Sequence, residues 1–376
     1  MFSDNEKISL RQFKRIIVFD LLSVSGLIIP RIAVGFAGRD GLSAIIVGTI
    51  IAIIYAAIII LITKNLNENF LDYSIHNAGR FITFIVGALF IVKLFVCCVF
   101  ATRLFGEVIN ETLLPKTDSR IIFIMLLLIS AYAASKGFEV RARITEVLYY
   151  IVIVPLLILL LFGLRDAHIS NLMPVFTESP IDIMKGGYGI FLTFSLLELI
   201  LFMESFIKIN NTKVSKERNI FSYTLQAVVI GGIMDLLLFI VTVGILGINE
   251  TKAKVWSTIS IIQIIKLPGS FIQRQDALII TLWIFSIFTI ISGFIYYISF
   301  ISKKIFHVSS QNYLIIPIII LIFGASVIPI DADKYYKYFG KYMMYIGIPQ
   351  SILLPLIILL IGKLRKIGHT KVVAKS

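Results

Sequence analysis

Ten long apolar stretches follow one another along this chain, and they constrain its fold more than any other feature. Most reach the roughly twenty residues that a helix needs to cross the hydrocarbon core of a bilayer. Because lipid cannot satisfy backbone polar groups, only helices and closed barrels span a membrane. The pattern predicts an all-α, polytopic membrane protein with ten transmembrane helices, near residues 12–37, 42–63, 79–109, 119–135, 144–164, 184–207, 217–247, 276–304, 312–330 and 341–364.

Composition and charge agree with a membrane protein. The chain is 58% hydrophobic and only 15% charged, whereas soluble domains are about one quarter charged. Residues 1–376 therefore constitute one predicted membrane domain. The formal charge of +13 lies mainly in loops and tails beside the spans, so we expect the lipid bilayer, and no nucleic acid, as a partner. The lysine and arginine bias of these loops places both termini in the cytoplasm.

Two spans contain small and polar residues that interrupt their apolar character. The first carries Ser23, Val24, Ser25 and Gly26, with Pro30 beyond; the second carries residues 193–198 after three glycines. A helix that breaks at membrane depth is tolerated where it lines a polar cavity, and paired breaks indicate a transporter-type ligand site. The alternative is a continuous helix whose small residues pack against a neighbour.

The two interrupted spans occupy the same place in each half of the chain, since they are the first and the sixth of ten. Ten spans divide into two sets of five, and an odd number per set requires opposite topologies. This predicts inverted repeats over about 12–164 and 184–364, with spans one and six both interrupted. Free N–H groups at a break suit an anionic ligand group. The predicted ligand-binding residues are Ser23, Val24, Ser25, Gly26, Thr193, Phe194, Ser195 and Glu198.

Charged residues inside the spans are candidates for a proton or charge relay. Glu198 lies at mid-depth, where a lone carboxylate costs about 2.5 kcal/mol or more, so it requires protonation, a partner or water. Lys93 requires a carboxylate or a cavity, or it extends to the surface, and an approach to Glu198 is one option. Asp20 and Asp235 are further relay candidates, each with a structural role as the alternative.

Several other patterns limit the function. The adjacent Cys97 and Cys98 match neither metal-ligand nor redox spacing, and we interpret them as packing residues, with no metal or cofactor expected. No nucleotide-binding or hydrolase motif occurs, so we do not expect an enzyme. The apolar run from Val255 to Leu267 is too short to span, which predicts an interfacial or re-entrant helix.

Five motifs resemble a known family, the B subunit of endospore germinant receptors. They are Ile8–Phe13, Ala37–Gly41, Gly137–Arg143, Phe194–Glu198, and Arg274-Gln275-Asp276 followed by Trp283. The resemblance extends over nearly the whole chain. The chain departs from the family pattern in having a single glycine, Gly26, at the first interruption, and in having Gln273 where an acidic residue is typical.

The resemblance implies a member of the amino acid–polyamine–organocation superfamily, with the LeuT-type five-plus-five inverted repeat. Such B subunits work with an A-type subunit and a C-type lipoprotein in the spore inner membrane. They detect a small nutrient, commonly an amino acid, and start germination. The site would comprise residues 23–26 and 193–198. The alternatives are a proton-coupled secondary amino acid transporter that uses Glu198 or Asp20, and an ion or water conduit.

Overall fold

The computed structural model describes residues 7–64, 69–208, 213–266, 275–328 and 332–373. Gln273 and Arg274, which contribute to the family resemblance, lie outside these ranges. The named elements of the described chain are all helices. Those of the first half are α1 (Leu10–Ala37), η1 (Gly38–Asp40), α2 (Gly41–Lys64), α3 (Phe70–Ala78), α4 (Arg80–Thr112), α5 (Ser119–Ser135), α6 (Phe138–Asp166) and the short η2 (Ile169–Asn171).

The second half repeats the pattern of long apolar helices with short helices between them. Its elements are α7 (Pro180–Phe194), η3 (Ser195–Leu199), α8 (Ile200–Met203), η4 (Glu204–Phe206), α9 (Lys213–Ala253), α10 (Ser257–Ile264), α11 (Gln275–Phe306), α12 (Asn312–Val327), α13 (Ala332–Tyr342), η5 (Met343–Gly347) and α14 (Ile348–Val373). Within α9, Gly247 has φ 74° and bends the helix where the sequence predicts that the seventh span ends.

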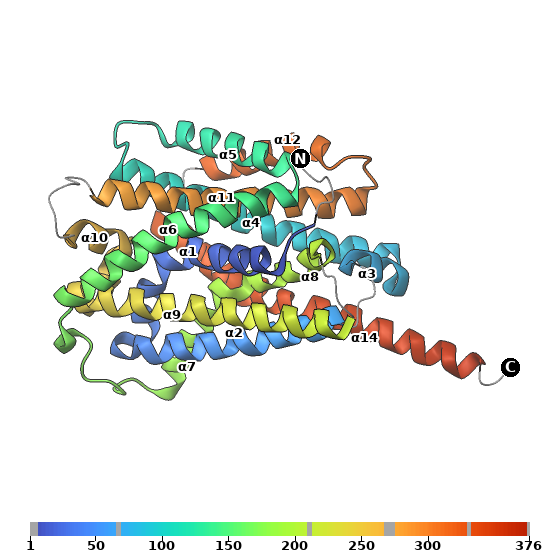
Figure 1. The fold of residues 1–376 in the computed structure, drawn as a ribbon, viewed down its shortest axis with the longest axis horizontal. Helices are drawn as coiled ribbons and strands as arrows, with labels where there is room; N and C mark the ends of the chain where they lie inside the picture. Colours follow the sequence, from blue (N-terminus) through green and yellow to red (C-terminus); the bar gives the residue numbers. More distant parts are fainter. Residues whose placement is uncertain (1–6, 65–68, 209–212, 267–274, 329–331, 374–376) are drawn as a thin grey trace.

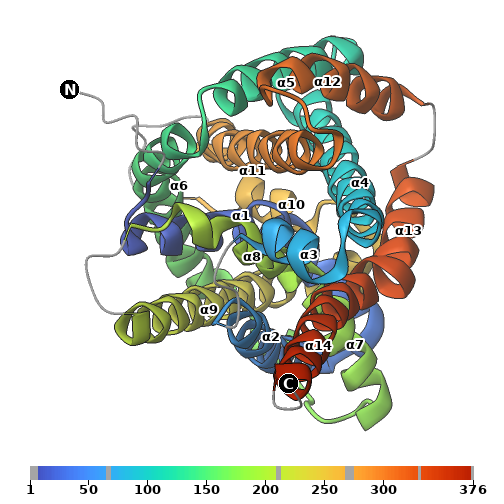
Figure 2. The same cartoon turned by 90° about the vertical axis from the view of Figure 1, so that its right-hand side faces the viewer.

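The helices form a bundle with α1 in its interior. α1 contacts α9, α7, α6 and α11, and Figure 2 shows α5 and α12 together at one edge of the bundle, away from α2, α7 and α9. Figure 1 shows the long helices running roughly side by side. α1 begins at a capping box, in which Ser9 accepts from the Gln12 backbone N–H and the Gln12 side chain accepts from the Ser9 N–H.

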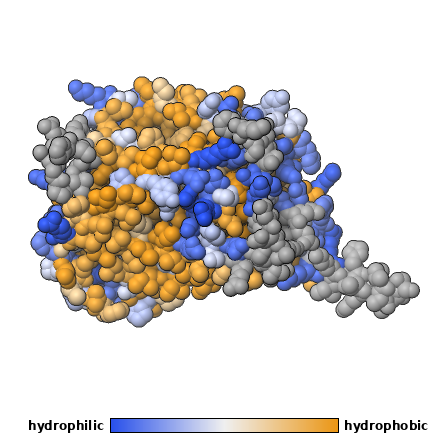
Figure 3. Space-filling view, in the orientation of Figure 1, coloured by the Kyte–Doolittle hydropathy of each residue, from blue (hydrophilic) through white to orange (hydrophobic). Residues whose placement is uncertain are grey.

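The apolar surface of the bundle fits a bilayer. By length and composition, seven helices of the described residues can cross a membrane, and Ser119–Ser135 and Asn312–Val327 are shorter apolar helices. The first of the seven, Leu10–Thr63, runs through α1, η1 and α2. Figure 3 shows hydrophobic residues over the middle of one face and hydrophilic residues gathered toward its ends. The protein is thus an all-α, multi-pass membrane protein, and the count of ten spans stays a prediction.

The predicted interruption of the first span is wrong. Every residue of α1 from Leu10 to Ala37 is α-helical, including Ser23, Gly26 and Pro30. The Ser23 hydroxyl donates to the Phe19 carbonyl one turn earlier, at 2.6 Å, as serine does inside an intact helix. The small residues therefore serve packing in this helix, which is the alternative interpretation of the sequence.

The second segment changes helix type instead of opening. α7 ends at Phe194, and residues Ser195–Leu199 form a 3₁₀-helix before α-helix resumes at Ile200. The Ser195 N–H donates to the Leu192 carbonyl, so the backbone remains hydrogen-bonded through the transition. A 3₁₀ stretch inside a longer helix commonly marks a hinge or local strain. This is a tightening of the helix and not the unwound break that the sequence predicts.

Candidate functional site

A pocket lies between α1, α4, the α7–η3 junction, α11 and α13. We call it the central pocket; it encloses about 570 Å³ of empty space including its mouth. Its lining includes Val24, Cys97, Thr193, Ser195, Phe294 and Met343. Concave, mostly apolar pockets with a few polar groups are typical of small-molecule sites. This pocket is therefore the candidate ligand site.

Aromatic side chains of α13 cover one side of the central pocket. The rings of Phe100 on α4 and Phe339 on α13 stack with centroids 3.7 Å apart and planes 5° apart. Tyr336 also lines the pocket, and Phe100 packs on it at 5.8 Å. Figure 2 shows α13 beside α4, set apart from the direction of α14. The five π-helical residues Met343–Gly347 join α13 to α14, and π-helical segments are frequent at functional sites.

A fully buried ion pair joins α4 to η3. Lys93 Nζ lies 2.8 Å from Glu198 Oε1, and both side chains are completely inaccessible to solvent. Lys93 also donates to the Ser351 hydroxyl, which itself donates to the Gly347 carbonyl at 2.7 Å. Apart from the ion pair, neither Glu198 oxygen has a hydrogen-bond partner in the described part of the chain. The carboxylate therefore retains unused acceptor capacity in a desolvated site.

The ion pair lies about one helical turn beyond the floor of the central pocket. Cys97 lines the pocket, and Lys93 precedes it by four residues on the same face of α4. Ser195 likewise lines the pocket three residues before Glu198. The Cys97 and Met343 sulfur atoms, 4.0 Å apart, contribute to this floor. Glu198 therefore lies close to the pocket without lining it.

The serines of α1 have partners inside the bundle and do not line the central pocket. Ser23 Oγ donates to the Phe19 carbonyl and also lies 3.1 Å from the Ser286 carbonyl of α11. Ser25 Oγ donates to Asp235 Oδ1 on α9 at 2.9 Å. These contacts fix α1 against α11 and α9. Of the four predicted residues in this segment, Val24 is the pocket-lining one.

Gly26 provides the space for the Trp283 indole of α11. A Cβ atom at Gly26 would lie 2.4 Å from two atoms of that ring, so a larger residue requires the indole to move. Trp283 Nε1 donates to the Ser23 carbonyl at 3.0 Å. Trp283 is part of the family resemblance, and the structure gives it a packing role against α1 that the sequence analysis does not identify.

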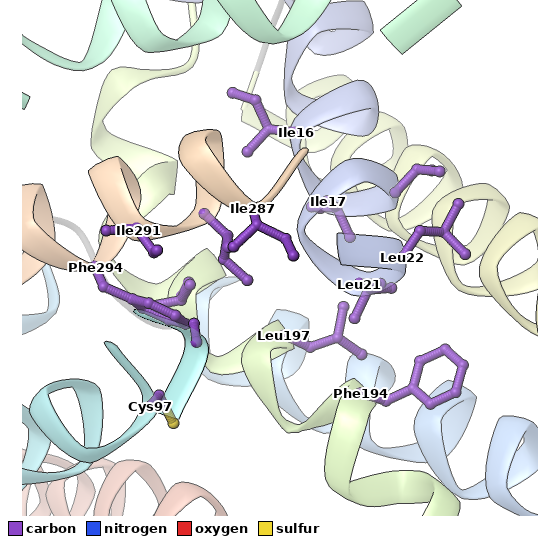
Figure 4. Close-up of a cluster of buried hydrophobic side chains, with 14 of the residues drawn as sticks. Ile16, Ile17, Leu21, Leu22, Cys97, Phe194, Leu197, Ile287, Ile291 and Phe294 are labelled. Carbon is purple, nitrogen blue, oxygen red and sulfur yellow. The ribbon is translucent and has the colours of Figure 1, made fainter. Parts of the chain in front are cut away.

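The α7–η3 junction contributes more directly to the pocket. Thr193 and Ser195 line it, and their hydroxyls donate to the Ile190 and Leu192 carbonyls at 2.9 and 2.7 Å. Phe194 points elsewhere: Figure 4 shows it near Leu21, in the cluster of buried side chains between α1 and η3. The hydroxyls of Thr193 and Ser195 retain acceptor capacity toward a ligand.

Asp20 lies in a second buried ion pair, away from the pocket lining. Arg141 Nη2 donates to both carboxylate oxygens of Asp20, at 2.6 and 2.7 Å. Arg141 Nε donates to the Thr289 carbonyl at 3.2 Å, and its guanidinium fills the space beside Gly293. This bidentate geometry holds α1, α6 and α11 together. Sequence reasoning places Arg141 in an inner loop and does not identify this role.

The sequence interpretation also leaves Ser351, Cys97 and Met343 without a role at the site. Cys97 is predicted to be a packing residue, and Ser351 and Met343 lie in ordinary apolar surroundings of the last span. No local signal distinguishes them. By contrast, Arg103 and Glu107 pair at 2.9 Å, as their spacing of four residues indicates.

A protein-family model described as "Spore germination protein" matches residues 7–334. The chain belongs to this family of spore germination permeases. It is 26% identical to spore germination protein YndE of Bacillus subtilis over 294 residues, which cover 77% of this chain and 78% of that protein. It is 25% identical to spore germination protein B2 of the same organism over 354 residues, 90% and 91% of the two chains.

Solved structures of transporters share the fold. A Na⁺-coupled sialic acid symporter in a substrate-bound, outward-open state superposes with a TM-score of 0.67, at 12% identity, over 90% of this chain and 77% of that chain. MhsT in complex with L-phenylalanine has a TM-score of 0.60 at 11% identity, over 92% and 87%. These similarities show a LeuT-type transporter fold for this member of the spore germination family.

Proposed function

We propose that this protein is the B-type subunit of a spore germinant receptor, which binds a small nutrient in the central pocket and triggers germination. The nutrient class that we infer is amino acids. The protein works in the spore inner membrane with A-type and C-type subunits, and both termini face the cytoplasm. Its single membrane domain, residues 1–376, comprises ten spans in a five-plus-five inverted repeat, over about 12–164 and 184–364.

The central pocket carries this proposal. It lies in the interior of a transporter fold, and its lining comes from both halves of the chain, with Val24 and Cys97 from the first and Thr193, Ser195 and Met343 from the second. The Lys93–Glu198 pair lies one turn beyond it. An amino acid presents an apolar side chain and a charged backbone end. The pocket offers apolar contacts to the first and the hydroxyl oxygens of Thr193 and Ser195 to the second, with the Glu198 carboxylate one turn beyond.

Signalling requires that the nutrient bind one conformation more tightly than another, because equal affinity shifts no equilibrium. The contacts around the pocket suggest which elements move. Lys93 on α4 bonds both Glu198 on η3 and Ser351 on α14, so a ligand ammonium that competes for Glu198 would loosen the connection between α4 and η3. The aromatic cover from α13 would respond to the same ligand.

The test is the germination response of spores that carry Glu198→Gln, or the milder Thr193→Val, in place of the unaltered chain. We expect a loss of response to amino acids in the first and a weaker response in the second, at equal amounts of membrane-inserted protein. The control is Asp182→Asn, which removes an exposed carboxylate from the same helix, α7. A dose–response equal to that of the unaltered protein in both pocket variants would contradict the proposal.

A second candidate function is a proton-coupled secondary amino acid transporter. One observation favours it: Asp235 is buried, hydrogen-bonded to Ser25, and has no cationic partner in the described ranges. Asp20 is a poorer proton carrier than the sequence indicates, because Arg141 engages both of its oxygens. Concentrative, pH-dependent uptake of an amino acid into liposomes would favour transport. Ligand-gated ion flux without accumulation would favour the third alternative, a conduit.

A further inference from the structure

A second cleft lies at the end of the bundle where α5 turns into α6 and α11 turns into α12. It holds about 640 Å³ of empty space, and we call it the basic cleft. Polar groups that line it are Ser135, Lys136, Lys303, Ser310, Gln311 and Asn312. It shares no lining residue with the central pocket. Nothing in the proposed nutrient site requires it.

The charge of the basic cleft is uncompensated. Its described lining contains two lysines and no carboxylate. Lys304, the neighbour of Lys303, donates to both oxygens of Asp72 at 2.7 and 2.9 Å, whereas Lys303 has no ion pair with a described residue. Lys136 lies over the Tyr132 ring at 5.0 Å, a contact that leaves its ammonium protons available for an anion. Two cations therefore face one cavity.

Neutral donors complete the cleft. The side-chain amides of Gln311 and Asn312 and the hydroxyl of Ser310 line it beside the lysines. The sixteen-residue helix α12 begins here; Gln311 makes no capping hydrogen bond, and the Asn312 N–H donates to the Ser310 hydroxyl at 3.4 Å. Together with the two ammonium groups, these donors match the several acceptor oxygens of a phosphate group.

Aromatic residues adjoin the cleft lining in sequence, as expected at the depth of lipid headgroups. Tyr132, Phe306 and Tyr313 each lie within three residues of a lining residue and are more than half exposed, at 67%, 57% and 70%. Aromatic residues gather at membrane–water interfaces, and basic pockets between membrane helices bind anionic headgroups. The stacked pair of Tyr296 and Phe300, whose rings lie 6.1 Å apart, also lines the cleft.

We propose that the basic cleft binds the phosphate group of an anionic lipid. Lys136 and Lys303 neutralise its charge, and the side-chain amides of Gln311 and Asn312 donate further hydrogen bonds. A phosphatidylglycerol headgroup fits this arrangement, because it carries a net negative charge. A phosphatidylcholine headgroup does not, because its choline cation would lie beside the lysines. The bound lipid would join α5–α6 to α11–α12 at one edge of the bundle (Figure 2).

The experiment measures retention of phosphatidylglycerol against phosphatidylcholine by the purified full chain, in nanodiscs of defined composition or by native mass spectrometry. We expect preferential retention of phosphatidylglycerol by the unaltered protein. The double variant Lys136→Gln/Lys303→Gln should bind it about 30-fold more weakly, from the usual contribution of two interfacial lysines. The matched control, Lys116→Gln/Lys337→Gln, removes two exposed charges that lie outside the cleft lining.

The outcomes separate lipid from free phosphate. Equal retention of the two lipids by the unaltered protein would overturn the proposal, as would equal losses in the two double variants. A third arm adds glycerol phosphate or inorganic phosphate as a competitor. Failure of millimolar competitor to displace the lipid supports the lipid source. Tight binding of the free phosphates, lost in the Lys136/Lys303 variant, would keep phosphate recognition and overturn the lipid as its source.

Discussion

Residues 23–26 of α1 and residues 193–198 of the α7–η3 junction occupy corresponding predicted spans and have different structures. Both place serine and small or polar residues in a long apolar stretch. α1 stays α-helical through its segment, whereas the second segment changes to a 3₁₀-helix at Ser195. The polar groups of the first segment are bonded to other helices. Those of the second line the central pocket or form the Lys93–Glu198 pair.

The difference lies in what faces each segment. Gly26 lies against the Trp283 indole, so its missing side chain is explained by close packing and no break is needed. Glu198 cannot be explained by packing, because a buried carboxylate requires a charged or polar partner. Small residues in a membrane helix therefore indicate a ligand site only when an unexplained polar group accompanies them.

The largest effect that we predict comes from separating the buried pair. Lys93→Met leaves Glu198 without its cation in a dry site and should cost about 3–5 kcal/mol of stability. The double variant Lys93→Met/Glu198→Leu should recover most of this loss, because an apolar pair of similar volume avoids the desolvation penalty. Thermal or denaturant unfolding in detergent, arranged as a double-mutant cycle, measures the coupling.

The control for this cycle is the exposed pair Lys185–Asp182 on α7, which lies at 3.0 Å. Lys185→Met should change the stability by less than about 1 kcal/mol, since solvent screens exposed pairs. A loss in Lys93→Met as small as that in the control would mean that Glu198 is hydrated or protonated. Residues 193–198 would then have only a packing role, as residues 23–26 do.

A smaller effect should follow from filling the space at Gly26. Gly26→Ala places a Cβ atom 2.4 Å from the Trp283 ring and should destabilise the protein by about 1–3 kcal/mol. Gly35 lies in the same helix with no atom near its would-be Cβ, so Gly35→Ala should be neutral or slightly stabilising. The unfolding midpoints of the two variants test this contrast. Equal midpoints would mean that the Trp283 indole moves aside without cost, and that close packing does not explain Gly26.

Much of the fold is predictable from the sequence because membrane spans are recognised by length and composition alone. The predicted span 119–135 has the same bounds as α5, and the predicted short helix after Val255 corresponds to α10. α10 packs against α1, α9 and α11, with most of its residues buried. The helix α3 is missed, because its nine residues are amphipathic and lie between two spans.

The candidate site is less predictable, because its contacts join residues far apart in sequence. Lys93 and Glu198 are identifiable from the sequence because charged residues are rare in the middle of a membrane span, and the structure places them together. Ser351 and Met343 carry no such signal, since each is an ordinary residue of an apolar helix until its neighbour is known, and the family motif marks Trp283 without giving its contact with Gly26. The ion pair of Asp20 is hard to predict for the same reason, because its partner Arg141 lies far away in sequence, on α6 near the membrane boundary of its span.

The smallest predicted effects distinguish a structural serine from a pocket serine. Ser25→Ala removes the hydrogen bond to Asp235 and should cost about 1–2 kcal/mol of stability, with an unchanged nutrient dose–response for the protein that remains inserted. Among the described residues, the Ser195 hydroxyl bonds only the Leu192 carbonyl one turn earlier, and Ser195 lines the central pocket. Ser195→Ala should therefore leave stability nearly unchanged and weaken the response about 5-fold, the effect of one lost hydrogen bond to a ligand. Measuring unfolding and germination in both variants reveals whether the two effects separate. If both serines affected stability alone, the α7–η3 junction would be a packing element like α1, and the ligand would have to bind elsewhere.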